Sequence, residues 1–252
     1  MIKFFRKIRQ NLLAENKFSK YLVYAIGEII LVVIGILIAL SINNWNERQQ
    51  RNRDELEYLK RLQKDIELSI ERTQSGVQFM SSAAEYAKSI IDDLNNCSIP
   101  TSNQKSFVEG MFIQGKLSPP LLIKGTINEL ESTGKLLSIR NVQLREQLTD
   151  VIQRYEEDNA IYSQLVSIVS PSLNYINDHF SFKIDGAGKR GSDIEWDDVI
   201  FDLDGICQDR QFIASLLTIQ NYTYDNVGWN QRHIERLKNL KSSIEKELEL
   251  KD

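Results

Sequence analysis

The feature that most constrains this chain is an apolar run of 21 residues, Leu22 to Ile42, that carries a single charged side chain, Glu28. A helix of that length, at about 1.5 Å per residue, matches the ~30 Å hydrocarbon core of a bilayer. The run therefore predicts a transmembrane helix. A cleaved signal peptide is the alternative, because Ala39 and Ser41 form a loose cleavage pattern, but the run is longer than the roughly 7 to 15 apolar residues of signal peptides.

The flanks of the run indicate its orientation. Residues 1–21 carry six basic side chains and one acidic side chain, a balance of +5, whereas residues 43–252 sum to −8 within a total of −4. By the positive-inside rule, the basic arm stays in the cytoplasm and the acidic domain is exported. Tyr21, Tyr24 and Trp45 lie where aromatic rings settle at the membrane interface, so we expect them to act as anchors.

The basic arm has a helical pattern of its own. Phe5, Ile8 and Leu12 share one helical face, and most of the basic side chains lie on the others. This pattern predicts an amphipathic helix on the anionic inner leaflet, and a disordered tail that only sets the topology is the alternative.

Small and charged residues within the run are candidates for intramembrane contacts. Gly27, Gly35 and Ala39 fall near one helical face, and Gly35 and Ala39 have the small-xxx-small spacing that lets two helices approach closely. Glu28 is costly in hydrocarbon. It can extend toward Lys20 and the headgroups, contact another span, or belong to a proton or ion relay.

Beyond the run, the apolar spacing is helical. An apolar stripe follows three- and four-residue steps to Leu94, and Asn95 and Asn96 precede a connection that has room for one short helix near Phe107. Further helical patterns follow. The stripe positions are Leu59, Leu62, Ile66, Ile70, Thr73, Val77, Met80, Ala84, Ala87, Ile91, Leu94, Leu144, Leu148, Val151 or Ile152, Tyr155, Tyr162, Leu165, Val169, Phe212, Leu216, Ile219, Val227, Ile234, Leu237, Ile244 and Leu248. The pattern predicts an all-α fold, in which the transmembrane helix continues into an elongated antiparallel helical bundle over residues 43–252.

Local signals suggest where some of these helices begin and end. Thr126 is expected to cap a short helix that ends at a left-handed Gly134, and Asn141 to cap the next helix. Pro171 is expected to restart that helix, because proline suits a first turn. The charged tail over residues 241–252 is expected to be solvated and partly frayed.

Two cysteines, Cys97 and Cys207, are the only ones in the chain. An extracytoplasmic location permits them to form a disulfide, and two separate thiols are the alternative.

Two short segments resemble catalytic motifs, but the sequence around each of them does not supply the elements that the motif requires. Residues 199–205, VIFDLDG, match the first motif of haloacid-dehalogenase-like phosphatases, but only 47 residues follow and no strand–helix alternation builds a parallel sheet. A capping-box pattern, Ser192 to Glu195, makes a strand there doubtful. Residues 186–191 match G-x-G-x-x-G, yet acidic residues follow where a phosphate would bind.

Metal and nucleic-acid sites are also unsupported. Acidic residues over 193–204 could gather calcium, but the EF-hand spacing is absent and a solvated acidic edge is the simpler interpretation. His179 and His233 are far apart, without zinc spacing, and each is expected to be half-exposed on a helix. Basic residues outside the arm alternate with acids, so no nucleic-acid partner is expected.

The opening 50 residues, above all GEIILVVIGILIALSINNWNE, resemble the amino terminus of a family of uncharacterised single-span membrane proteins of bacteroidete-type Gram-negative bacteria, catalogued as a domain of unknown function. Residues 127–148, INELESTGKLLSIRNVQLREQL, are similar to a second segment of that family. The resemblance implies an inner-membrane anchor with a periplasmic helical domain, and it brings no catalytic residues.

These observations lead to a functional expectation without catalysis or a cofactor. We expect a membrane-anchored structural or interaction protein, with the bilayer and either a second copy or another membrane protein as partners. The alternative is an extracytoplasmic sensor or ligand-binding bundle that signals through a partner, which requires a lined cavity between helices.

Overall fold

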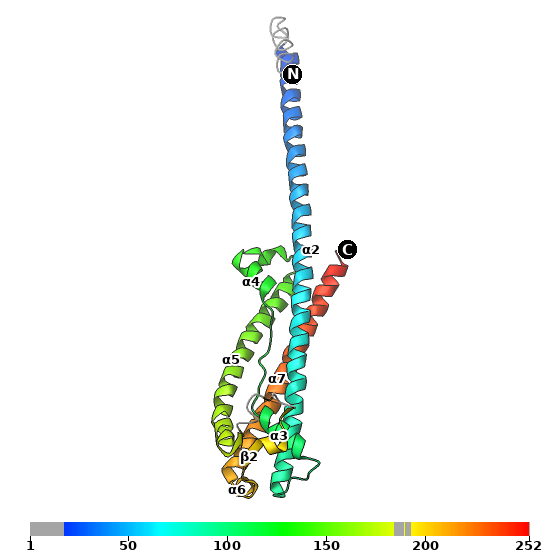
Figure 1. The fold of residues 1–252 in the computed structure, drawn as a ribbon. Coiled ribbons are helices and arrows are strands. Elements are labelled where there is room, and N and C mark those ends of the chain that lie inside the picture. The colour runs from blue at the N-terminus through cyan, green and yellow to red at the C-terminus, as the bar shows by residue number, and fades with distance from the viewer. Residues whose placement is uncertain (1–17, 184–188, 190–192, 252) are drawn as a thin grey trace. The chain divides into compact units, whose positions relative to one another are not determined.

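The computed structural model describes residues 18–183, 189 and 193–251, and it is mostly helical, at 83%. The chain divides into two compact units, Met1–Glu55 and Leu56–Asp252. The elements in chain order are α2 (Phe18–Asn95), α3 (Gln104–Ile113), α4 (Gly125–Ser132), η1 (Lys135–Ser138), α5 (Val142–His179), β1 (Phe180–Phe182), η4 (Trp196–Asp198), β2 (Val199–Phe201), α6 (Leu203–Gln208) and α7 (Arg210–Glu249) (Figure 1).

The first unit, in its described part, is the beginning of helix α2, from Phe18 to Glu55. This stretch contains the predicted transmembrane run, and by length and composition it is long and apolar enough to cross a membrane. The predicted amphipathic helix of the basic arm lies outside the described residues. Tyr21 and Tyr24 belong to α2, but their side chains are likewise outside the described part.

The second unit is built from three long helical stretches: α2 from Leu56 onward, α5 and α7. The predicted apolar stripes form its core. The first core cluster consists of Tyr58, Leu59, Leu62, Ile66, Ile70, Leu122, Ile127, Leu130, Ile139, Leu144, Leu148, Val151, Ile234, Leu237, Leu240, Ile244 and Leu248. The second consists of Ile90, Ile91, Leu94, Phe107, Val108, Met111, Val169, Ile176, Phe180, Ile194, Val199, Ile206, Phe212, Leu216 and Ile219. The end of α2 at Asn95, the short helix α3 and the left-handed Gly134 (φ 66°) confirm three local predictions.

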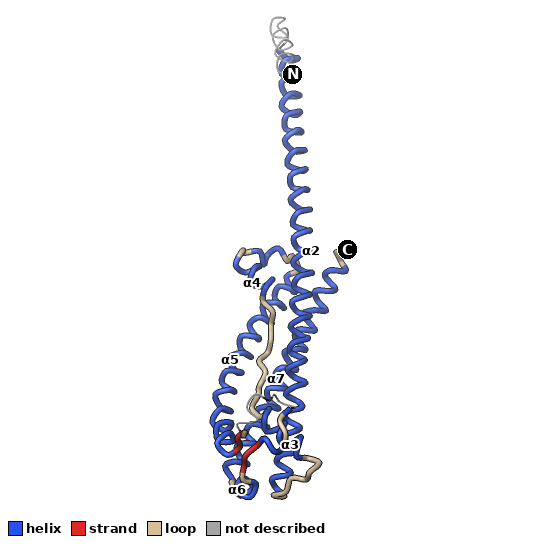
Figure 2. Tube along the Cα trace, in the orientation of Figure 1, coloured by secondary structure: helices blue, strands red, loops and turns tan. Residues whose placement is uncertain are grey.

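Between these clusters, the core is polar. An extended segment over residues 116–124, which we call the strap, runs between the helices without regular secondary structure (Figure 2). Buried polar side chains from two helices flank it, namely Ser69, Thr73, Asn226, Asn230 and His233. They supply hydrogen-bond partners to a backbone that no strand or helix pairs.

A small β-ribbon corrects the prediction of an all-α fold. Strands β1 and β2 pair antiparallel, with Phe180 opposite Phe201 and Phe182 opposite Val199. In each strand, alternate residues point to opposite faces, so these four side chains share one face. Phe107 of α3 packs against that face, its ring centroid 6.3 Å from Phe180 and 5.6 Å from Phe201. The doubt about a strand at 199–201 was therefore wrong.

Three further local predictions were wrong. Thr126 lies inside α4, whose N-cap residue is Lys124. Pro171 does not restart a helix, because α5 continues through it from Val142 to His179. The charged tail is not frayed, because α7 continues to Glu249, with Ile244 fully buried and Leu248 9% exposed in the first core cluster. These two side chains recur every four residues and pack on the core, whereas the charged neighbours only cover the outer face.

Candidate functional site

The exposed apolar segment of α2 is the first candidate site. No residue in the most apolar stretch of this helix is buried within the described structure. The large hydrophobic side chains of the segment are between 47% and 69% exposed: Leu22, Ile26, Ile29, Ile30, Leu31, Val32, Val33, Ile34, Ile36, Leu37, Ile38, Leu40 and Ile42. A folded soluble domain rarely leaves a contiguous apolar surface of this kind uncovered.

The proposed contact residues lie along this segment. An added Cβ on Gly27 or Gly35 would meet no atom within 4 Å, so both positions are open to an approaching helix. Ala39 is exposed and Glu28 is half-exposed. Trp45, the predicted interface anchor after the run, is 60% exposed.

The second candidate site is a polar cluster that holds α4 and η1 on α2. Glu129 of α4 accepts hydrogen bonds from Arg61 and from the Tyr58 hydroxyl, the latter at 3.0 Å. Lys135 donates to the same hydroxyl at 3.3 Å. The hydrogen bond from Arg61 holds the pKa of Glu129 below its usual range, and the bond from Tyr58 adds to this effect. This cluster fixes α4 and η1 to helix α2. Both elements lie largely within residues 127–148, the second segment that resembles a known family.

Helix ends nearby are capped by side chains. Asp65 of α2 accepts a hydrogen bond from the Thr126 backbone N–H at 3.0 Å, and so caps α4 from another helix. The Asn141 side chain accepts from the Leu144 N–H at 3.1 Å, which confirms its prediction as a cap. Its amide also donates to Glu247 of α7 at 2.6 Å, so one residue caps α5 and joins it to α7.

We expect Asn141→Ala to lower the free energy of unfolding by about 1–2 kcal/mol, because it removes a cap and leaves Glu247 without this donor. Gln143→Ala, an exposed substitution in the first turn of the same helix, should change stability by less than about 0.5 kcal/mol. Urea unfolding of the two variants measures the difference. Equal stabilities would show that the Asn141 cap contributes nothing.

The third candidate site is the corner where α2 ends. The Cys97 N–H donates to the Leu94 carbonyl at 3.0 Å and the Ser98 N–H to the Asp93 carbonyl at 3.2 Å, which is the hydrogen-bond pattern of a Schellman motif. Cys97 has a φ of 45° at the position where glycine is usual. Cys97 therefore carries a side chain at a left-handed backbone position, which disfavours residues other than glycine.

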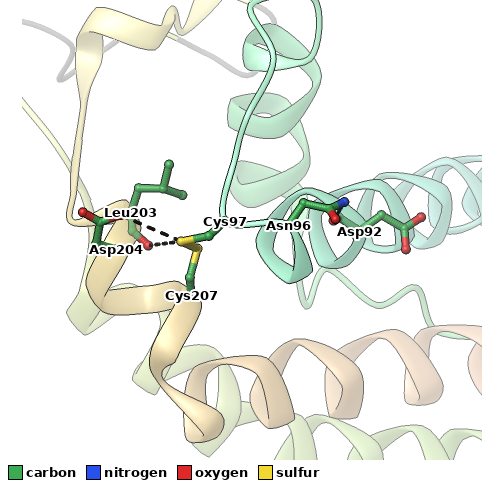
Figure 3. The surroundings of a disulfide bond; sticks show 6 residues. All are labelled: Asp92, Asn96, Cys97, Leu203, Asp204 and Cys207. Atoms are coloured by element: carbon green, nitrogen blue, oxygen red, sulfur yellow. Dashed lines mark hydrogen bonds between the residues drawn. A yellow bond between two sulfur atoms is a disulfide. The ribbon is translucent and has the colours of Figure 1, made fainter.

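That side chain forms a disulfide with Cys207 of α6 (Figure 3), and their Cα atoms are 5.5 Å apart. The Cys97 sulfur is also 3.9 Å from the Leu203 carbonyl oxygen and from one carboxylate oxygen of Asp204. The bond closes a sequence separation of 110 residues. It ties the end of α2 to the segment that carries the β-ribbon and α6.

Among the elements that the structure describes, the phosphatase-like motif over residues 199–205 lacks the parallel sheet that such a motif requires. Asp202 follows β2 and lies at the start of the six-residue α6, and Asp204 is within α6. The described residues contain only a two-stranded antiparallel sheet, not the parallel sheet that the phosphatase motif needs. Most of residues 186–191 lie outside the described residues. In the described part, no group of three or more His, Cys, Asp or Glu side chains could hold a metal ion.

The two histidines differ in environment. His179 is 38% exposed and lies 3.8 Å from Asp209, as expected of a half-exposed helix residue. His233 is fully buried, so the expectation for it was wrong. No local pattern signals this burial, because the strap that covers His233 is more than a hundred residues away along the chain.

One hollow of about 300 Å³ lies between the start of α5 and the end of α7. Its lining is mostly polar and includes Gln147, Ser243 and Lys246.

Comparison with known proteins places the chain by its sequence. No curated protein and no solved structure matches it. Residues 28–166 match the family DUF6090, which is described as a family of unknown function. This match covers more than half of the 252 residues and includes most of the apolar segment, α3, α4, η1 and the first part of α5. The chain therefore belongs to the DUF6090 family of unknown function.

Proposed function

We propose that this protein is a membrane-anchored structural or interaction protein, with no catalysis of its own, that self-associates or serves as a subunit of an envelope complex. The exposed apolar segment of α2 carries the proposal. Half-burial of each Ile, Leu or Val contributes about 1 kcal/mol, so thirteen such side chains favour a bilayer over water by a large margin. Residues 22–42 are the proposed span.

Charge and cysteine usage support an orientation. The arm of residues 1–21 has a balance of +5, which favours a cytoplasmic amino terminus. The Cys97–Cys207 disulfide suits an oxidising compartment such as the periplasm. Together with the resemblance described for the first 50 residues, these features favour the inner membrane of a Gram-negative bacterium, with residues 43–252 in the periplasm.

Association through the span makes a specific prediction at Gly35. Gly35→Leu is expected to weaken self-association about tenfold, because small residues let two helices pack closely in lipid and an isolated helix has room for the larger side chain. Val33→Leu, on the opposite helical face, is the matched control and should leave association unchanged. Disulfide-independent crosslinking in native membranes measures the dimer fraction. Equal dimer fractions for Gly35→Leu and the unchanged chain would remove this face from the proposal.

The partner is tested by isolating the full chain. The protein is extracted from its native membrane in mild detergent through a carboxy-terminal tag, and its mass is measured with and without crosslinking. A homo-oligomer or a stoichiometric membrane partner supports the proposal. A monomer that brings no partner, with or without the crosslinker, contradicts it.

The hollow between α5 and α7 favours a second candidate, an extracytoplasmic ligand-binding bundle that signals through a partner. Its volume of about 300 Å³ is at the lower end for small-molecule sites. Native mass spectrometry of the intact chain tests it: a bound small molecule that is lost in Gln147→Leu favours this candidate, and an empty chain does not.

A further inference from the structure

The strap is held in the core by side chains rather than by a sheet or helix. Hydrogen bonds join its backbone to polar side chains of α2 and α7. From α2, Ser69 accepts from the Ile123 N–H at 2.9 Å and Thr73 from the Leu121 N–H at 3.4 Å. From α7, Asn226 accepts from the Ser118 N–H at 3.1 Å, Asn230 donates to the Ser118 carbonyl at 3.1 Å, and His233 Nε2 donates to the Leu121 carbonyl at 3.0 Å. Partners therefore come from α2 on one side and from α7 on the other. The strap joins these two helices through its main chain.

His233 makes the closest of these contacts at the middle of the strap. The two contacts between Leu121 and Thr73 are long, at 3.4 and 3.5 Å, whereas the His233 bond is 3.0 Å. Pro119 and Pro120, just before Leu121, have no N–H to donate. Among the hydrogen bonds of Leu121, the bond to His233 is therefore the shortest.

The surroundings of His233 suit a neutral ring. The carbonyl of Leu121 can only accept, so Nε2 carries the proton. The other nitrogen, Nδ1, is buried and has no hydrogen-bond partner among the described residues. From α7 the ring faces Arg236, and from α5 it faces Tyr155, whose ring centroid is 6.0 Å away, and Asp158.

Asp158 is the acidic neighbour that favours a positive charge on His233. Asp158 is already paired with Arg236. Lys124, at the end of the strap, pairs with Glu156 at 2.5 Å and lies over the Tyr155 ring. The residues that α2 presents to the strap, Ser69 and Thr73, do not titrate.

We propose that His233 is an acid-sensitive latch: a second proton turns its buried ring into an imidazolium, and the ring leaves the core for water, which opens the middle of the strap. The added proton would lie on Nδ1, in the core, beside the positive charge of Arg236. The ring and the strap must then separate for the imidazolium to reach water. Opening exposes Leu122, which is buried in the first core cluster, and frees the main chain between α2 and α7.

The pH range follows from burial. Burial lowers the pKa of His233 below its ordinary value of about 6.5 and outweighs the hydrogen bond to the Leu121 carbonyl, which raises it; the charge of Arg236 lowers the pKa and that of Asp158 raises it. The neutral ring therefore contributes stability that is fully present above the unfolded pKa and is lost as the pH falls through about 6.5 toward the folded pKa.

Hydrogen exchange of the full chain in detergent micelles tests the latch. The chain has two histidines, so few other side chains titrate between about pH 7.5 and about pH 5.5. On acidification, residues 117–123 should exchange about three- to tenfold faster after correction for the intrinsic rate, as loss of one hydrogen bond implies. His233→Gln keeps an N–H donor and cannot titrate, so its strap should stay equally protected at both pH values. His179→Gln is the matched control and should open like the unchanged chain.

Three outcomes would overturn the latch: no change in exchange of the strap on acidification, acid opening that persists in His233→Gln, or opening that is lost in His179→Gln. A second measurement covers a poorly folded His233→Gln. In the unchanged chain, the NMR resonances of the His233 ring should titrate over the same pH range in which the strap opens. Opening without His233 titration would also overturn it.

Discussion

Removal of the disulfide, by Cys97→Ser with Cys207→Ser, is expected to lower the free energy of unfolding of the second unit by about 4 kcal/mol. The bond closes a separation of 110 residues, so its loss returns much conformational entropy to the unfolded chain. Urea unfolding followed by the fluorescence of Trp196, which packs against the second core cluster, measures the effect.

The conformation of Cys97 supplies a control for this experiment. Cys97→Gly with Cys207→Ser also lacks the disulfide, but glycine suits the left-handed position at the end of α2. This variant should be about 1 kcal/mol more stable than the double-serine variant. A double-serine variant with the same free energy of unfolding as the unchanged chain would show that the disulfide does not stabilise the fold.

Phe107→Ala is expected to cost about 3–5 kcal/mol, because it removes a fully buried ring and leaves a cavity. Phe107 is 1% exposed, and its centroid lies within 6.3 Å of those of Phe180, Trp196 and Phe201. Loss of these edge and stacked contacts adds to the cost of lost burial. The midpoint of urea unfolding should fall accordingly, and exchange should increase in the β-ribbon.

Phe79→Ala is the matched control, since Phe79 is 43% exposed on the outer face of α2. We expect it to cost less than about 1 kcal/mol. Similar costs for Phe79→Ala and Phe107→Ala would mean that the aromatic cluster does not stabilise this end of the bundle.

Local periodicity predicted much of the fold. Leu59, Leu62 and Ile66 recur at helical spacing, and all three are buried where the pattern placed them. The caps at Gly134 and Asn141 were also predictable, because the geometry of a helix end depends on a few adjacent residues.

Contacts between distant residues were not predictable. The strap depends on hydrogen bonds to Ser69 and His233, which are 54 and 112 residues away from their partners. No local pattern distinguishes such a buried histidine from an exposed one. Asp65 likewise caps α4 from another helix, so Thr126 was given that role by default. The β-ribbon was missed because three-residue strands carry too few alternations to outweigh the surrounding helical signals.

The topology of the chain in its native membrane is the most direct test of the proposed anchor. Asn11→Cys places a thiol in the basic arm and Ser132→Cys places one at the exposed end of α4. A membrane-impermeant maleimide should label Ser132→Cys in intact spheroplasts and Asn11→Cys only after permeabilisation, and intact mass should show that residues 1–42 are retained. Labelling in the opposite order, or a protein cleaved after residue 41, would contradict an amino-terminal anchor with a periplasmic bundle.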